Sequence, residues 1–288
     1  MAEITARMDS RLNSLEPTYK RLSPDEIEQE KANNYNMESG TLHEKDGHDC
    51  PLCKNKGYIA EVRFVEMYGH GVETLVPCKC QRVRSALARL DRSGLKGIVK
   101  KYTFDNYQTD DEWQTYIKER AQAFCREPKG WFFIGGQSGA GKTHICTAIA
   151  VHFIRQGKET KYMLWRDEIT EIKGYANDPE KYKPMVDALK NADVLYIDDL
   201  FKDGQDASGR YVAPTPAEVR IAFEVLNWRY NSPDLVTIIS SERTLFELEL
   251  IDQALAGRIA EKTKPVNCCI NLNPDRKKNY RMNGVKTL

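Results

Sequence analysis

Net charge is almost absent from this 288-residue sequence, because 43 lysine and arginine residues are balanced by 42 aspartate and glutamate residues, leaving a formal charge of +1. Overall charge therefore provides no attraction for nucleic acid, and any such contact needs a local basic surface. Internal repeats and low-complexity tracts are lacking too, and a hydrophobic share of 41% is ordinary for a globular protein. Collagen-like, low-complexity and wholly disordered classes are thereby excluded.

Long hydrophobic runs are also missing. No segment approaches the roughly 20 apolar residues that cross a bilayer, and residues 1–20 contain no apolar core of a secretory signal. We therefore expect a soluble cytoplasmic protein with no membrane contact. The eight cysteines fit that compartment as free thiols or metal ligands better than as disulfides.

The chain falls into four expected regions. Residues 1–45 are polar and charged, with a helix-start signal at Ser23-Pro24-Asp25-Glu26. Residues 46–90 hold a cysteine cluster, residues 91–112 form a basic linker, and residues 113–288 alternate apolar strand candidates with helical patterns. That alternation predicts an α/β fold whose parallel sheet is covered by helices on both faces. The strand candidates are Trp131–Gly135, Thr160–Trp165, Val194–Asp198, Leu235–Ser240 and Val266–Leu272, and the helices are expected near 142–156, 167–174, 182–191, 215–230 and 244–260.

The strongest motif lies between the first strand candidate and the following helix, and it matches G-x-x-x-x-G-K-[ST]. Glycines let backbone N–H groups turn inward to hold phosphate oxygens, and the helix N-terminus adds partial positive charge. We expect Lys142 to reach the β- and γ-phosphates of ATP and the Thr143 hydroxyl to coordinate Mg²⁺. The alternative, a glycine-rich turn that binds nothing, is disfavoured by the spacing and by both flanking elements. The motif consists of Gly136, Gln137, Ser138, Gly139, Ala140, Gly141, Lys142 and Thr143.

A second motif, residues 194–199, runs from four apolar residues into Asp198 and Asp199. This is typical of a buried strand that emerges at the carboxyl edge of a sheet, where ligands bind in open α/β folds. We expect Asp198 to hold Mg²⁺, directly or through water, and Asp199 to orient and deprotonate the attacking water. A strand ending in two solvated acids is the alternative. We further expect the strand 160–165 to separate the two motif strands in the sheet, as in ATPases of the AAA+ kind.

Four cysteines gather ahead of the α/β region and offer four thiolates to one tetrahedral Zn²⁺. The Cys-x-Cys spacing of the second pair is tighter than usual, and His48 and His70 lie close enough to replace a ligand. A structural role is favoured over a catalytic one, because four protein ligands leave no open coordination position. Buried or redox cysteines without a metal are the alternative. The expected ligands are Cys50, Cys53, Cys78 and Cys80.

With these motifs in place, the sequence resembles the AAA+ helicase loaders of the DnaC/DnaI type, including phage and mobile-element forms, and more distantly the IstB transposition ATPases. The resemblance covers roughly residues 48–282. It rests on the cysteine cluster, the segment Thr103-Phe104-Asp105-Asn106-Tyr107, both nucleotide motifs, and the downstream segments Thr237–Glu242 and Gly257–Ile259.

The resemblance implies further roles. Ser241 or Glu242 would sense the γ-phosphate, and Arg258 would be the arginine finger that reaches the nucleotide of a neighbouring subunit. A surface arginine on a helix is the alternative for Arg258. The resemblance also places Phe104 and Tyr107 near the adenine. Only 16 residues follow the last strand candidate, so we expect little or no helical lid, with Arg276 and Arg281 as candidates for a second sensor.

Seven basic side chains and one acid, Asp91, occur within residues 82–101. Such a stretch could contact single-stranded DNA through phosphate neutralisation. A solvated helix followed by a charged linker is the alternative. By positional analogy with related loaders, residues 1–45 would dock on the helicase and the ATPase region would self-associate. The basic residues are Arg82, Arg84, Arg89, Arg92, Lys96, Lys100 and Lys101.

The leading hypothesis from the sequence is an ATPase that loads a DnaB-type replicative helicase onto single-stranded DNA, with ATP, Mg²⁺ and Zn²⁺ as cofactors. The alternative is an IstB-like transposition helper that acts with a transposase on DNA. A third hypothesis, an adaptor that binds ATP without hydrolysing it, is supported only by Asp199, because many AAA+ proteins carry Glu at that position.

Overall fold

The structure is a computed structural model that describes residues 22–92, 95, 97–202 and 212–282. Residues 1–21 of the expected docking region, Lys96 of the basic stretch and the last six residues of the expected ATPase region lie outside the described residues. The chain divides into two compact units, one of residues 1–43 with 49–79 and one of residues 44–48 with 80–288. Across the described ranges, no helix has the length and apolar character needed to cross a membrane.

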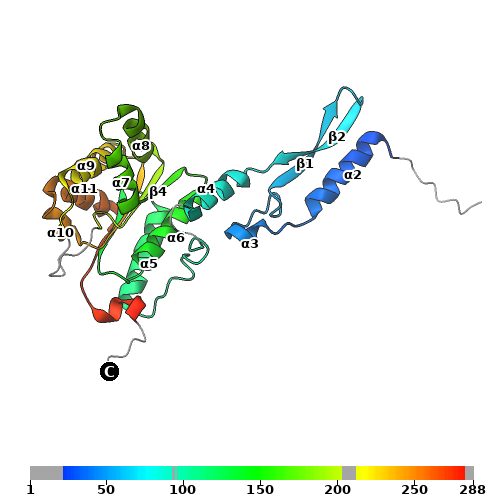
Figure 1. Cartoon of the computed structure of the whole chain (residues 1–288). Coiled ribbons are helices and arrows are strands. Elements are labelled where there is room, and N and C mark those ends of the chain that lie inside the picture. Colours follow the sequence, from blue (N-terminus) through cyan, green and yellow to red (C-terminus); the bar gives the residue numbers. More distant parts are fainter. Residues whose placement is uncertain (1–21, 93–94, 96, 203–211, 283–288) are drawn as a thin grey trace, which may run out of the picture. The chain divides into compact units, whose positions relative to one another are not determined.

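The larger unit is built on a five-stranded sheet between helices (Figure 1). Neighbouring strands are all parallel, and β3, β5 and β6 are buried along their whole length. The predicted α/β class with a five-stranded parallel sheet is confirmed. In the sheet order β4-β5-β6-β3-β7, the strands are β4 (Thr160–Leu164), β5 (Val194–Asp198), β6 (Val236–Ser241), β3 (Trp131–Gly136) and β7 (Cys269–Leu272).

The expectation about the separating strand is wrong. The strand predicted over 160–165 is β4, which lies at an edge of the sheet and pairs with β5. The strand between β3 and β5 is β6, which comes later in the chain. Helical crossovers allow consecutive strands to skip positions in a parallel sheet, so order along the chain does not fix order in the sheet. The carboxyl ends of β3, β5 and β6 nevertheless meet at one edge.

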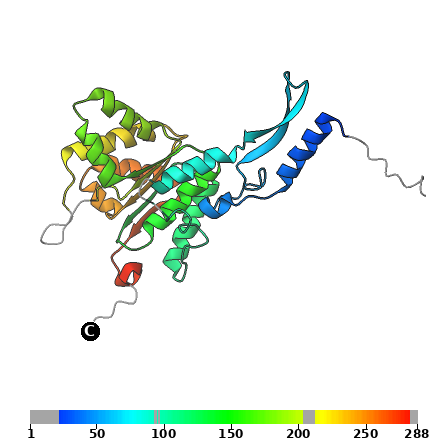
Figure 2. The ribbon, with the colours of Figure 1, turned by 45° about the vertical axis from the view of Figure 1, so that its right-hand side comes forward.

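Helices cover both faces of this sheet (Figures 1 and 2). Successive strand residues point to opposite faces, so Phe132 and Ile134 of β3 join one hydrophobic cluster and Phe133 joins the other. On the first face lie α4 (Cys80–Arg92), α5 (Glu112–Arg126) and α6 (Lys142–Arg155). On the second lie α7 (Trp165–Gly174), α8 (Pro179–Asn191), α9 (Pro216–Tyr230), α10 (Leu245–Glu249) and α11 (Gln253–Thr263).

The single helix predicted over 244–260 is two helices, α10 and α11. The Asp252 carboxylate accepts the backbone N–H of Leu255 at 2.7 Å, and this cap begins a new helix. After β7 the chain through residue 282 contains only two short 3-10 turns, Arg276–Lys278 and Tyr280–Met282. No helical lid therefore occurs between β7 and residue 282.

The smaller unit contains a helix and a β-hairpin. Helix α2 (Pro24–Met37) begins where the sequence predicted, because Ser23 and Glu26 form a capping box. A short helix, α3 (Leu42–Asp46), follows across the boundary of the two units. Strands β1 (Tyr58–Val65) and β2 (His70–Pro77) pair antiparallel. The hairpin was not predicted from the sequence.

Polar side chains of α2 bind the backbone of this hairpin. Asp25 accepts the N–H of Gly71 at 2.6 Å, while Asn36 accepts the N–H of Ala60 at 3.0 Å and donates to its carbonyl at 2.8 Å. These bonds satisfy strand groups that would otherwise be open for pairing. Within the described part of this unit, Ala32 and Ala60 are the only fully buried apolar residues besides cysteine.

Candidate functional site

The glycine-rich motif folds as predicted, as a loop from β3 to the first turn of α6. Gly136 and Gly139 have φ angles of 106° and 78°, a region that favours glycine. A Cβ at Gly136 would collide with the Leu272 carbonyl, and one at Gly139 would collide with the Asn279 side chain. The loop therefore requires glycine for both its backbone angles and its close neighbours.

Lys142 is buried in this loop and donates hydrogen bonds to the carbonyls of Gly136 and Gln137, both at 2.8 Å. Burial lowers the pKa of its ammonium, and the nearby negative charge of Asp199 opposes that effect. A buried cation held by backbone carbonyls can move to a stronger acceptor, because charge-assisted bonds to phosphate exceed those to neutral oxygens.

The structure brings the two predicted Mg²⁺ ligands together. Thr143 Oγ1 donates to Asp198 Oδ1 at 3.3 Å, and this buried carboxylate also accepts from the Ser240 hydroxyl and from Tyr162 Oη at 3.1 Å. Burial raises the pKa of Asp198, and the charge of Asp199 raises it further. A hydroxyl and a carboxylate are oxygen ligands of the kind that Mg²⁺ prefers, so the residues present fit this ion.

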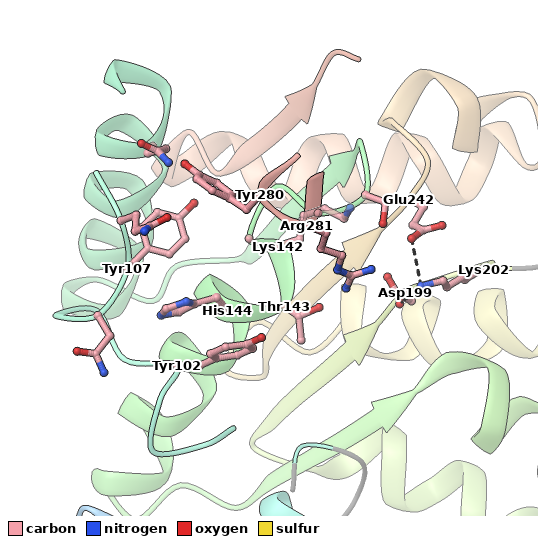
Figure 3. Close-up of a pocket in the computed structure, with 16 residues that line it drawn as sticks. Tyr102, Tyr107, Lys142, Thr143, His144, Asp199, Lys202, Glu242, Tyr280 and Arg281 are labelled. Atoms are coloured by element: carbon pink, nitrogen blue, oxygen red, sulfur yellow. Dashed lines mark hydrogen bonds and ion pairs between the residues drawn. The ribbon is translucent and has the colours of Figure 1, made fainter. Parts of the chain in front are cut away.

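Asp199 lies beside two further charged groups at the end of the sheet. Lys202 Nζ is 2.7 Å from Asp199 Oδ2 and 3.1 Å from Glu242 Oε1, as drawn in Figure 3. Although burial raises the pKa of Glu242, its hydrogen bond with Lys202 brings that pKa below the usual value. Ser241 instead donates to the Leu200 carbonyl at 2.8 Å. Of the two residues predicted to sense phosphate, Glu242 lines the cavity and Ser241 anchors a turn.

One cavity of about 310 Å³ connects these groups to an aromatic end. Figure 3 shows Lys142 and Thr143 between Tyr102, Tyr107 and His144 on one side and the Asp199 cluster on the other. Tyr102 stacks on His144 with ring centroids 4.5 Å apart, and the edge of Tyr107 meets the same ring at 5.2 Å. Flat rings beside a phosphate loop suit a nucleobase.

Of the two aromatic residues expected near the adenine, Tyr107 and Phe104, only Tyr107 lines the cavity. The buried hydroxyl of Tyr107 has no hydrogen-bond partner in the described chain. Burial raises the pKa of this hydroxyl, so it remains a neutral donor. Phe104 packs partly buried against the hydrophobic core, outside the cavity lining.

The chain after β7 returns to the phosphate loop. Tyr280 N–H donates to the Gly139 carbonyl at 3.1 Å, and the Gln137 amide donates to the Asp275 carbonyl at 2.7 Å. This return places Arg281 in the cavity lining, whereas Arg276 is outside it.

Arg258, the expected arginine finger, lies on α11 and does not line the cavity of its own chain. Its Nε donates to Asn227 Oδ1 at 2.9 Å, and its guanidinium lies 4.7 Å from the centroid of the Phe223 ring.

Six residues of this site were not predicted from the sequence: Lys202, Ser240, Tyr162, Tyr102, His144 and Tyr280. Tyr102 directly precedes the segment Thr103–Tyr107, and His144 directly follows the phosphate-loop motif. Their position beside these motifs could have indicated them. The others come from separate strands and turns, and only the fold brings them together.

The four predicted zinc ligands lie together and are buried. Their sulfur atoms are all within 4.8 Å of one another, and the sulfurs of Cys50 and Cys78 are 3.8 Å apart. A tetrahedral site with Zn–S bonds of about 2.3 Å places sulfurs roughly 3.8 Å apart, so the four residues fit Zn²⁺. Neither His48 nor His70 belongs to this group in the described chain.

The basic stretch begins on α4, whose Val83, Leu87 and Leu90 join the hydrophobic core. Arg84 is buried and forms an ion pair with Asp46 at 2.6 Å. The start of the stretch is thus a helix, as in the alternative interpretation of a solvated helix and a charged linker, but this helix packs on the core and its Arg84 is buried.

The chain is similar to several known proteins. Residues 55–268 match the family model described as IstB-like ATP binding protein. The phage-like element PBSX protein XkdC of Bacillus subtilis (strain 168) is 29% identical over 252 residues, 83% of this chain and 88% of that protein. The replicative helicase loader DnaC of Escherichia coli (strain K12) is 26% identical over 114 residues, 38% of this chain and 46% of that protein.

A solved structure of the replication initiator DnaA, bound to AMPPCP and single-stranded DNA, shares the fold with a TM-score of 0.50 and 18% identity. It covers 63% of this chain, and this chain spans about half of it (53%). The family match itself covers most of the chain, including both nucleotide motifs. The chain therefore belongs to the IstB-like ATP-binding protein family and is an AAA+ P-loop ATPase.

Proposed function

We propose that this ATPase loads a DnaB-type replicative helicase onto single-stranded DNA at the start of replication. The observation that carries the proposal is similarity to the replicative helicase loader DnaC in a chain whose nucleotide site is complete in Lys142, Thr143, Asp198 and Asp199. The fold shared with the replication initiator DnaA supports a role in initiation. The transposition helper has the IstB-like family match in its favour, but it is less well supported because the relative that is named for a function is a replicative helicase loader.

Each group at the site has a task in this proposal. The ammonium of Lys142 leaves the loop carbonyls and binds the β- and γ-phosphates. Thr143 and Asp198 supply oxygen ligands to Mg²⁺, which neutralises phosphate charge when bound. Asp199 orients the attacking water and accepts its proton. Arg258 stabilises the γ-phosphate charge of a neighbouring subunit, so hydrolysis depends on self-association.

The cysteine cluster holds a structural Zn²⁺ in this proposal. Its four buried sulfurs fill a tetrahedral shell and leave no position for a substrate. The smaller unit has only two fully buried apolar residues besides cysteine in its described part, so its core alone is too small to stabilise it. Metal ligation supplies what apolar burial lacks in such small units.

The helicase docks on residues 1–90 in this proposal. At the tip of the β1–β2 hairpin, Phe64, Met67 and Tyr68 are 69%, 80% and 58% exposed. Neighbouring apolar side chains this exposed are typical of a surface that a partner covers.

The test is light scattering on a size-exclusion column, with the full chain, a DnaB-type helicase, ATP and Mg²⁺. We expect a stable complex that the double variant Phe64→Glu/Met67→Glu loses. Phe246→Glu is the matched control, because Phe246 is 70% exposed on α10 of the larger unit, and it should retain the complex. Absence of a helicase complex, together with binding to a transposase, would favour the transposition helper.

A further inference from the structure

Lys202 is a charged residue of the nucleotide site that neither motif contains. Its ammonium pairs with both Asp199 and Glu242, at 2.7 and 3.1 Å. All three side chains line the same cavity as Lys142 and Thr143, and Figure 3 shows them at the end remote from the aromatic rings. The side chains of the two acids are only 17% and 13% exposed, whereas that of Lys202 is 37% exposed. Lys202 is therefore the member of the cluster with room to move.

The backbone fixes the position of Lys202. Asp199 and Phe201 have φ angles of 59° and 55°, which are uncommon for residues other than glycine and occur at functional sites where packing enforces them. Leu200 and Phe201 are fully buried, and Leu200 N–H donates to the Ser240 carbonyl at 2.8 Å. This tight turn returns the chain so that Lys202 faces the cavity.

The charges at this end of the cavity require a cation. Two carboxylates, Asp199 and Glu242, face the space beyond Lys142 and Thr143, where the last phosphate of a bound nucleotide would lie. Like charges this close repel each other strongly when they are partly shielded from water. ATP carries one more phosphate into this space than ADP does, so the repulsion falls mainly on ATP.

We propose that Lys202 is a second phosphate-binding lysine of the site: it holds Asp199 and Glu242 while the site is empty and contacts the γ-phosphate when ATP binds. By neutralising the two acids, it gives the protein its preference for ATP over ADP. This inference rests on the nucleotide position proposed above.

The experiment is calorimetric titration of the full chain with AMPPCP and with ADP, both with Mg²⁺. We expect Lys202→Met to weaken AMPPCP binding at least tenfold and to leave ADP binding within twofold. ADP binding also reports that the variant is folded. Lys202→Arg keeps the charge and should retain most of the preference for AMPPCP.

Two further variants separate the charge effect from loss of structure. In Lys202→Met/Glu242→Gln one repelling acid is also removed, so AMPPCP affinity should recover in part. Lys173→Met breaks a comparable pair, Lys173 with Glu218 at 2.7 Å, outside the cavity, and should change the affinity for neither nucleotide.

Equal weakening of AMPPCP and ADP by Lys202→Met would overturn the inference, and so would unchanged affinity for both. Loss of hydrolysis with unchanged AMPPCP affinity would also overturn it, because Lys202 would then act only through Asp199. If the wild-type chain binds neither nucleotide, both the proposed nucleotide position and this inference fail. If the wild type binds both nucleotides but Lys202→Met does not lower the preference for AMPPCP, only this inference fails.

Discussion

Replacing Ser240 with alanine tests how the site holds Asp198, the acid proposed to bind Mg²⁺. The Ser240 hydroxyl donates to Asp198 Oδ1 and accepts the N–H of Asp199 at 3.0 Å, so it joins the two acids of the second motif. A hydrogen bond to a charged group contributes about 1.5–3 kcal/mol. We therefore expect Ser240→Ala to weaken Mg²⁺ binding. The Mg²⁺ concentration that gives half the maximal rate of ATP hydrolysis, the Mg²⁺ midpoint, should rise by roughly 10- to 150-fold, at about 1.4 kcal/mol for each factor of ten.

The pH dependence of Ser240→Ala gives a second measure. Burial raises the pKa of Asp198, and the bond from Ser240 counteracts that rise. Without this donor the pKa of Asp198 rises further. Because the ionised carboxylate is the form that binds Mg²⁺, hydrolysis is lost as pH falls through that pKa, and the loss should begin at a higher pH in the variant.

The measurement is the steady-state ATPase rate over a range of Mg²⁺ concentrations, at mildly acidic and neutral pH. Ser241→Ala is the matched comparison, because this adjacent hydroxyl donates to the Leu200 carbonyl instead. The same oxygen also accepts the N–H of Arg243 at 3.1 Å. The variant should lower thermal stability, since it loses two neutral bonds of about 1 kcal/mol each, and should leave the Mg²⁺ midpoint within about twofold. The reasoning is refuted if Ser240→Ala keeps the wild-type Mg²⁺ midpoint and loses activity at the same acidic pH as the wild type. It is also refuted if Ser240→Ala and Ser241→Ala shift the Mg²⁺ midpoint equally.

Three other perturbations have definite expected outcomes. Lys142→Ala should abolish the rise in melting temperature that ATP gives the wild type, measured in a thermal shift assay; a full ATP-induced rise would contradict the phosphate role. Arg229→Met should destabilise the larger unit by more than about 3 kcal/mol in urea unfolding, because this fully buried guanidinium donates five hydrogen bonds whose acceptors would lose their partner; Arg220→Met on the same helix should cost less than about 1 kcal/mol. A zinc chelator should release about one Zn²⁺ per chain and remove amide protection from the β1–β2 hairpin while the parallel sheet keeps it, as measured by hydrogen exchange; unchanged hairpin protection would show that no metal stabilises it.

The local motifs were predictable from the sequence because their chemistry requires contiguous residues. Lys142 and Thr143 follow a strand and a glycine loop, and Asp198 ends an apolar run, so each could be placed by its neighbours in the chain. Ser240 and Lys202 could not, since they reach the acids only through the order of the strands and a left-handed turn. That order was mispredicted because helical crossovers skip sheet positions.

The hairpin was missed for a different reason. In β1, Glu61 and Arg63 alternate with Ala60, Val62 and Phe64, and of these three only Ala60 is fully buried while Phe64 is exposed. The pattern therefore lacks the strong contrast of a core strand. Polar contacts with α2, from a distant part of the chain, hold the hairpin as well. Ser23, by contrast, was predictable because a helix cap depends on residues three positions apart.

The return of the chain from β7 to the phosphate loop has a consequence for synthesis on the ribosome. The first motif strand, β3, pairs with β6 and β7, and the loop is bonded to Leu272 and Tyr280, all of which are translated much later. The nascent phosphate loop therefore emerges without the neighbours that shape it, and long-range pairings of this kind form slowly. We therefore expect a partly translated chain to bind ATP only after the residues that follow the sheet have left the ribosome.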